Sequence, residues 1–166
     1  KQALIRSAIG ARDERVAAPA TASTGAAQPA PSQLARGPAP AAAEARSADA
    51  SANAERAEVL AALQDWARAW SERDTAAYLD FYSAEFRPPR RQSRTRWEAE
   101  RRARIDNKSF IEVQIGSPVV FIESGRARVQ FDQSYKSDRI NENGRKTLTW
   151  EKQDGKWKIV REEVRT

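Results

Sequence analysis

The chain has 166 residues and a formal net charge of +6, from 29 basic and 23 acidic side chains. It contains no Cys, His or Met, which excludes a disulfide framework, a cysteine-based zinc site and any catalytic arrangement that needs a thiol or an imidazole. Only carboxylates and carbonyls remain as metal ligands, and no cluster of them stands out. The sequence therefore predicts neither a metal site nor a cofactor.

The aromatic residues divide the chain into two parts. All 13 Trp, Tyr and Phe residues lie at or after Trp66. Large apolar side chains supply most of the free energy that offsets chain entropy, so we expect one folded domain over residues 54–166. Residues 1–15 have the one-sided spacing of a short helix, the remnant of an upstream element. Residues 16–53 contain 16 Ala and 5 Pro, which predicts a disordered Ala/Pro-rich linker.

Helical patterns come first within the predicted domain. The first helix has a single apolar stripe, formed by Val59, Leu63, Trp66 and Trp70. A second, shorter helix is expected after Asp74, a good N-cap, and Pro88-Pro89 prevents its continuation. A third is predicted near residues 93–105, where Thr95 and Glu98 have the spacing of a capping box.

After Asn107 the hydrophobic period changes from that of a helix to that of a strand. Strands are predicted near residues 111–115, 119–123, 127–135, 146–152 and 156–164. Asn143-Gly144 and Asp154-Gly155 are the strongest hairpin signals, and they bracket the fourth of these strands. Three helices followed by a run of antiparallel strands predict an α+β fold.

With this order of elements, the chain resembles the nuclear transport factor 2-like superfamily, also called SnoaL-like. Within that superfamily it is most similar to the accessory domain found C-terminal to some bacterial L,D-transpeptidase catalytic domains. The resemblance covers about 110 residues. The matching segments are 66–70, Asp74 with Tyr78, Tyr82 and Ser83, 93–97, 101–105, 133–138, 146–148 and 157–162.

The resemblance implies a cone-shaped curved antiparallel sheet packed on three N-terminal helices, with a pocket in the mouth of the cone. It also implies a bacterial cell-envelope protein linked to peptidoglycan, in the periplasm or envelope. The chain lacks the catalytic Cys and His of a transpeptidase and the Asp-His dyad of dehydratase-like members. These absences favour a binding role, although a fold of this kind hosts many unrelated functions.

The inward face of the third predicted strand gives the strongest indication of a site. Gln133 and Tyr135 continue a face that Ala127, Val129 and Phe131 make apolar, and a buried polar group without a partner costs about 1–3 kcal/mol. A pocket at the wide end of the cone removes that cost. We therefore expect both side chains to contact a ligand.

Other candidate ligand-binding residues carry competing interpretations. Trp70 is either a core residue, which we favour, or a pocket wall. Tyr78 and Tyr82 lie one helical turn apart and need hydroxyl partners, which a core network or a pocket can supply. Asp138 falls at a strand end near Tyr135, where it is either a turn residue or a pocket carboxylate.

The segment from Arg87 to Arg104 holds eight Arg against two Glu. It is either a solvated helix face with ion pairs along the helix, or a surface for an anionic partner. A third interpretation concerns Arg101, which shares a helical face with Trp97 and Ile105 and has Arg104 beside it. An inward guanidinium there is suited to bind a carboxylate, and the stem peptides of peptidoglycan carry carboxylates.

The leading hypothesis is a non-catalytic domain that binds a peptidoglycan-derived peptide or an envelope protein partner. The alternatives are a SnoaL-like enzyme (isomerase, dehydratase or hydrolase) that uses a pocket Asp and Tyr, and a module that forms a homodimer through the sheet. Nucleic acid is disfavoured as a partner because only Trp97 interrupts the Arg cluster and no recognition motif is present. No stretch approaches the roughly 20 apolar residues of a membrane span.

Overall fold

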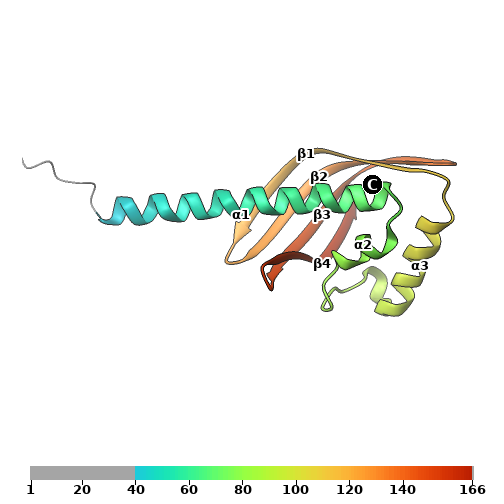
Figure 1. The fold of residues 1–166 in the computed structure, drawn as a ribbon, viewed down its shortest axis with the longest axis horizontal. Coiled ribbons are helices and arrows are strands. Elements are labelled where there is room, and N and C mark those ends of the chain that lie inside the picture. Colours follow the sequence, from blue (N-terminus) through green and yellow to red (C-terminus); the bar gives the residue numbers. More distant parts are fainter. Residues whose placement is uncertain (1–39, 166) are drawn as a thin grey trace, which may run out of the picture. The chain divides into compact units, whose positions relative to one another are not determined.

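The structure is a computed structural model that describes residues 40–165. Three α-helices, α1 (Pro40–Ser71), α2 (Thr75–Asp80) and α3 (Arg94–Asp106), precede four strands. The strands are β1 (Ile111–Glu123), β2 (Arg126–Ser137), β3 (Ile140–Gln153) and β4 (Lys156–Arg165). They form one antiparallel sheet in the order β1-β2-β3-β4, and the helices lie against one face of it (Figure 1). The predicted α+β fold, with a curved sheet on three helices, is confirmed.

Helix α1 begins at Pro40, well before the predicted domain boundary at Ala54. Residues 41–53 are rich in Ala and contain no Pro, so nothing in them interrupts a helix, while a Pro at the first helical position is well tolerated. Residues 40–53 are therefore helical instead of part of a disordered linker. The rest of the predicted linker and the predicted helix over residues 1–15 lie outside the described residues.

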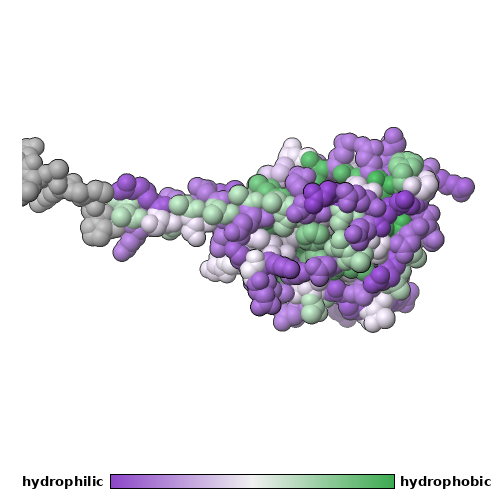
Figure 2. All heavy atoms as spheres, in the orientation of Figure 1, coloured by the Kyte–Doolittle hydropathy of each residue, from purple (hydrophilic) through white to green (hydrophobic). Residues whose placement is uncertain are grey.

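The two halves of α1 have different surroundings. Residues 41–51 are all exposed, and the first buried residue is Val59. The exposed half extends past the end of the sheet, and Figure 2 shows hydrophilic and weakly hydrophobic residues side by side along it. The second half packs against β1 with the predicted stripe, formed by Val59, Leu63, Trp66 and Trp70.

The core lies between the second half of α1 and the inner face of the sheet. Its largest fully buried side chains include Trp66, Phe131, Leu148, Trp150 and Ile159. On β2 the burial alternates as predicted, with Ala127, Val129 and Phe131 buried, Arg126 and Arg128 exposed and Gln130 half-buried. Because burying a large apolar side chain contributes about 1.5–3 kcal/mol, this cluster stabilises the fold.

The helix caps agree with the sequence in one case and differ in the other. The Asp74 side chain accepts a hydrogen bond from the Ala77 N–H and caps α2, as predicted. For α3 the N-cap is Ser93, whose hydroxyl accepts from the Arg96 N–H, and not Thr95. A hydroxyl immediately before the first helical residue is the one that can reach the free N–H groups, which explains the shift.

Two strand predictions were wrong in detail. The predicted strands 111–115 and 119–123 are one strand, β1, with an irregularity between Gly116 and Val119. The β2–β3 hairpin turns at Asp138 and Arg139, because Ser137 pairs with Ile140, and Asn143-Gly144 lies inside β3 opposite Ser134 and Gln133. The hairpin at Asp154-Gly155 lies where it was predicted.

Candidate ligand-binding site

A cavity of about 650 Å³ lies where the apolar core ends, between α3 and the parts of β2, β3 and β4 beyond the core. Helix α1 contributes Trp70 to its wall, and β2 contributes Gln133 and Tyr135. The remaining lining residues are Arg101, Ala103, Arg104 and Ile105 of α3, Asn107 and Lys108 after it, Ile140, Glu142 and Lys146 of β3, and Glu162 and Val164 of β4. Four basic and two acidic side chains give the lining a net charge of +2.

Two buried charges and one half-buried charge meet at the inner end of this cavity. The Lys146 ammonium lies 2.8 Å from Glu162 Oε1, and the Arg101 guanidinium lies 3.5 Å from the same oxygen. The side chains of Lys146 and Glu162 are 4% and 2% exposed, whereas that of Arg101 is 17% exposed. The single carboxylate of Glu162 therefore pairs with two cations, and the three groups together have a net charge of +1 in a region with little access to water.

A pair of tyrosines completes the network below the cavity. The Tyr82 hydroxyl donates to Glu162 Oε2 over 3.0 Å, and the Tyr78 hydroxyl lies 3.0 Å from the Tyr82 hydroxyl. Since Tyr82 uses its proton on the carboxylate, Tyr78 is the donor in the second bond. Both tyrosines are buried and neither lines the cavity, so they support Glu162 from behind.

The strands explain how these charges come together. Lys146, Leu148 and Trp150 occupy alternate positions of β3, so all three side chains point to the inner face of the sheet. In β4 an extra residue is inserted, because Thr149 pairs with Arg161 but Trp150 pairs with Ile159. This bulge places both Ile159 and Glu162 on the inner face, which strict alternation does not allow.

Aromatic rings surround the buried ammonium. Lys146 Nζ lies 5.2 Å from the centroid of the Trp66 ring and 5.1 Å from that of Trp70. Trp70 in turn packs against Tyr135, with 5.2 Å between the ring centroids. The Arg101 guanidinium lies 5.3 Å from the Trp97 ring. These faces hold both cations by cation–π attraction and keep them turned toward Glu162.

The surroundings shift the pKa values of the buried groups. Burial by itself would raise the pKa of Glu162, but Lys146 and Arg101 lower it to about 2. Burial lowers the pKa of Lys146, and Glu162 offsets only part of that effect. Burial raises the pKa of Tyr78 to about 12 and, together with the nearby Glu162 carboxylate, raises that of Tyr82 well above its ordinary value. At neutral pH Glu162 is ionised and both tyrosines keep their protons.

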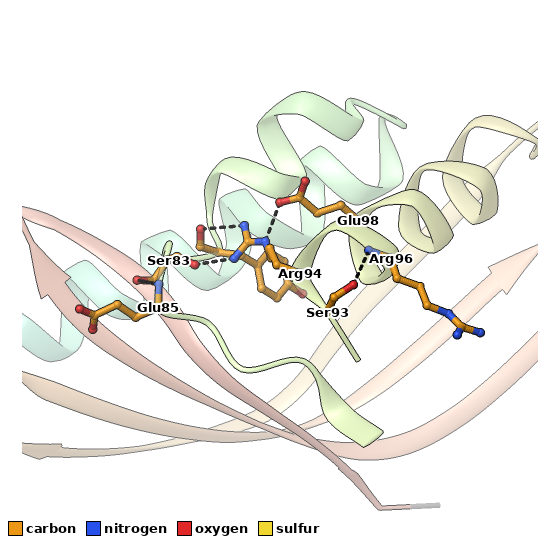
Figure 3. A network of polar contacts seen from close by, with 7 residues as sticks. Ser83, Glu85, Ser93, Arg94, Arg96 and Glu98 are labelled. Atoms are coloured by element: carbon orange, nitrogen blue, oxygen red, sulfur yellow. Dashed lines mark hydrogen bonds and ion pairs between the residues drawn. The ribbon is translucent and has the colours of Figure 1, made fainter. Parts of the chain in front are cut away.

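Arg94 fixes the backbone that carries Tyr82 to the start of α3. Its guanidinium donates to the backbone carbonyl of Ser83 and to the Glu98 carboxylate, as Figure 3 shows. It also donates to the backbone carbonyl of Tyr82. It also lies over the rings of Phe86 and Trp97. Arg94 thus ties the backbone of Tyr82 and Ser83 to the first turn of α3.

The structure brings most of the sequence-predicted site residues together. Of the eight, those that line the cavity are Trp70, Arg101, Arg104, Gln133 and Tyr135. Tyr78 and Tyr82 lie beneath it, hydrogen-bonded to each other. Asp138 is elsewhere: its exposed carboxylate accepts hydrogen bonds from the backbone N–H and the hydroxyl of Ser109 and so ties the start of β1 to the β2–β3 turn. A carboxylate between a strand end and a turn has backbone donors close by, which explains this structural role.

Two central residues, Lys146 and Glu162, were not predicted as site residues. For Lys146 the sequence does contain a signal, because a Lys that continues the alternation of Trp150 and Leu148 points inward. For Glu162 it contains none, since alternation from Trp157 and Ile159 places Glu162 outward and only the bulge turns it inward.

Two aspartates outside the cavity lining, Asp80 and Asp132, have structural partners. Asp80 pairs with Lys158, and Asp132 pairs with Arg145 on the outer face of the sheet. Among residues 40–165, no group of three or more acidic side chains is arranged to hold a metal ion. In the same part of the chain, none of the helices combines the length and the apolar character needed to cross a bilayer.

The fold and the cavity together define an α+β domain of the nuclear transport factor 2-like class. Residues 58–163 match the family described as the Cds6 C-terminal NTF2-like domain, and the chain belongs to that family. No curated protein sequence matches the chain.

Solved structures of longer proteins contain a similar domain. The structure of Bd1075 from Bdellovibrio bacteriovorus is 26% identical, with a TM-score of 0.61, and the match covers 66% of this chain and 39% of that one. The helical cell shape determining protein Pgp2 from Campylobacter jejuni (K307A mutant) is 23% identical, with a TM-score of 0.58, over 63% of this chain and 39% of Pgp2. The chain thus spans about two fifths of either protein.

A smaller protein matches over most of its length. An NTF2-like protein of unknown function from Pseudomonas putida KT2440 is 15% identical, with a TM-score of 0.59, over 68% of this chain and 86% of that one. At this level of identity the similarity concerns the fold alone.

Proposed function

We propose that this domain is a non-catalytic, ligand-binding accessory domain of a bacterial cell-envelope protein linked to peptidoglycan metabolism. The match to a C-terminal domain family, and to about two fifths of the bacterial protein Bd1075, supports an accessory domain of a longer bacterial protein. Pgp2, which shares the fold, is described as a helical cell shape determining protein. The ligand class we propose is a carboxylate-bearing peptide derived from peptidoglycan.

The observation that carries the proposal is the buried cluster of Arg101, Lys146 and Glu162. Burying a cation is costly unless it is paired, and here two cations share one carboxylate. A second anion in the cavity would restore the balance of charge. A guanidinium that is still partly exposed can bind such an anion with two parallel hydrogen bonds.

The rest of the cavity suits a peptide. Trp70 and Tyr135 provide an aromatic wall, and Arg104 and Lys108 add positive charge at the rim. A cavity of about 650 Å³ lies within the usual range for small-molecule sites, roughly 300–1,000 Å³. An acidic stem peptide could place its carboxylate at Arg101 and its aliphatic atoms along the rings.

The enzyme alternative needs a cavity carboxylate that can accept a proton, which a raised pKa beside a tyrosine hydroxyl would indicate. Glu162 lies beside Tyr82, but its pKa is lowered and two cations neutralise it. A carboxylate held in this way is a poor proton acceptor at neutral pH. The geometry of the cluster therefore supports binding better than general base catalysis.

Isothermal titration calorimetry with a disaccharide-tetrapeptide fragment of peptidoglycan tests the proposal. Replacing Arg101 by Gln removes a charge-assisted hydrogen bond, so affinity should fall about tenfold or more. Arg102→Gln is the matched control, because Arg102 lies on the same helix, is exposed and does not line the cavity. It should change affinity less than about twofold, since rim and surface charges contribute little. No binding at millimolar ligand, or an Arg101→Gln variant that binds like wild type, would contradict the proposal.

A further inference from the structure

The polar groups of the cavity are separated by charge. The cations lie toward α3 and the inner end, where Arg101, Arg104, Lys108 and Lys146 are found. The far side is formed by the hairpin of β2 and β3, and it is lined by Glu142 and Gln133. The cavity therefore has a basic side and a side that offers hydrogen-bond acceptors.

Strand geometry sets the distance between these sides. Glu142, Gly144 and Lys146 occupy alternate positions of β3, and Glu142 pairs with Tyr135 while Gly144 pairs with Gln133. At about 3.3 Å per residue, the Cα atoms of Glu142 and Lys146 lie roughly 13 Å apart. Gly144 places no side chain between them. A ligand can therefore contact both charges while lying along this strand.

The acceptors on the far side are not used by the protein. Gln133 Oε1 is buried and has no hydrogen-bond donor among residues 40–165. Glu142 is exposed and makes no ion pair within that same range. Glu162 Oε2, by contrast, accepts a hydrogen bond from Tyr82, and Glu162 Oε1 forms ion pairs with Lys146 and Arg101, although it too lacks a hydrogen-bond donor within residues 40–165. Because these two cations repel a ligand ammonium from Glu162, Glu142 and Gln133 are the acceptors left for it.

We propose that the cavity selects a peptide residue with a carboxylate at one end and a primary ammonium at the other. This inference rests on the proposed function and narrows its ligand class. The carboxylate binds at Arg101 and Lys146, and the ammonium binds at Glu142 with Gln133 as a second acceptor. A free amino group on the side chain of a stem peptide meets this requirement, whereas an acylated one does not.

Three synthetic peptides separate the two ends of the ligand. The first is N-acetyl-Ala-Glu-Lys with free carboxylates and a free lysine ammonium. The second carries an acetyl group on the lysine side chain, which removes the ammonium. The third has Gln in place of Glu and a C-terminal amide, which removes both carboxylates. Each is titrated into the whole chain by calorimetry.

The wild-type chain should bind the first peptide about three- to tenfold more tightly than the second, the range expected for one partly exposed ion pair. Glu142→Gln should remove this preference. Glu123→Gln is the control, because Glu123 is exposed at the end of β1 and lies outside the cavity. It should keep the preference. Gln133→Glu, which adds a second carboxylate, should increase it.

The other outcomes separate the two proposals. If the first two peptides bind equally and the third does not, the carboxylate site stands and the selection of an ammonium is wrong. If Glu142→Gln keeps the full preference, the ammonium binds elsewhere and this inference is overturned. If none of the three peptides and no muropeptide binds, the proposed function itself is contradicted.

Discussion

The inner face of β3 is apolar at one end and charged at the other. Trp150 and Leu148 are fully buried in the apolar core. The next inward residues are Lys146, Gly144 and Glu142, which line or border the cavity. The same alternation of a single strand thus builds a core and then a site. The site begins where apolar residues stop while the strand continues.

The two ends differ in what they contribute to the free energy of folding. The apolar end stabilises the fold, because burial of its side chains removes a large area from water. The charged end stabilises it little, because desolvation of three ions offsets most of their attraction. Replacing the whole cluster by apolar residues should therefore cost little, whereas removing one partner leaves a buried charge unpaired and costs more. The proposed binding of a ligand gives such a cluster a use.

The largest expected effect is at the apolar end. Phe131→Ala removes a fully buried ring that packs against Trp66, and we expect a loss of about 4 kcal/mol in the free energy of unfolding. Urea denaturation followed by tryptophan fluorescence measures it. Phe121→Ala on the outer face, where the side chain is 55% exposed, should cost about 1 kcal/mol or less. Equal losses in the two variants would show that the inner face is not the core.

The next effect concerns Glu162 and depends on pH. Its pKa is about 2 in the folded protein against an ordinary 4.5, so its contribution is fully present above pH 4.5. That contribution should disappear as the pH falls from 4.5 to 2, with a loss of about 3 kcal/mol. Urea denaturation across this range, in wild type and in Glu162→Gln, measures the difference.

Glu162→Gln should be about 3 kcal/mol less stable at pH 7 and should lack the pH-dependent loss of this residue. The double variant Lys146→Met with Glu162→Gln should recover part of the stability, because it also removes an unpaired buried cation. A wild type and a Glu162→Gln variant with parallel pH profiles would mean that the carboxylate is not paired in the folded state.

The smallest effect is expected where the two ends meet. Tyr82→Phe removes the hydrogen bond to Glu162 and leaves the buried Tyr78 hydroxyl without an acceptor, which should cost about 1–2 kcal/mol. Tyr135→Phe is the control, because its hydroxyl has no partner among residues 40–165. It should change the free energy of unfolding by less than about 0.5 kcal/mol. A Tyr82 variant as stable as the Tyr135 variant would remove the tyrosine pair from the network.

The sequence predicted the elements whose periodicity reflects one buried face. The Val59–Trp70 stripe and the alternation of Ala127, Val129 and Phe131 both reappear as buried residues. It misplaced features that depend on backbone detail. Asn-Gly favours a hairpin turn in general, but here Gly144 lies within a strand and the chain turns at Asp138 instead.

The sequence predicted those cavity residues that lie on strands with regular alternation of inward and outward side chains. Gln133 and Tyr135 line the cavity because they continue a regular strand. Glu162 could not be found in this way, because the bulge in β4 that turns it inward has no Gly or Pro to mark it in the sequence. The carboxylate that organises the two cations was therefore visible only in the folded structure.

Nuclear magnetic resonance of the tryptophan indoles tests the central claim, that the charged end of the inner face is a binding site for a carboxylate. Trp70 lines the cavity beside Lys146, whereas the Trp157 indole is hydrogen-bonded to Glu58 away from it. Titration with the disaccharide-tetrapeptide should shift the Trp70 indole resonance with saturation, leave that of Trp157 in place, and lose the effect in Arg101→Gln. A saturable shift at Trp157 alone, or a Trp70 shift that persists in Arg101→Gln, would contradict the claim.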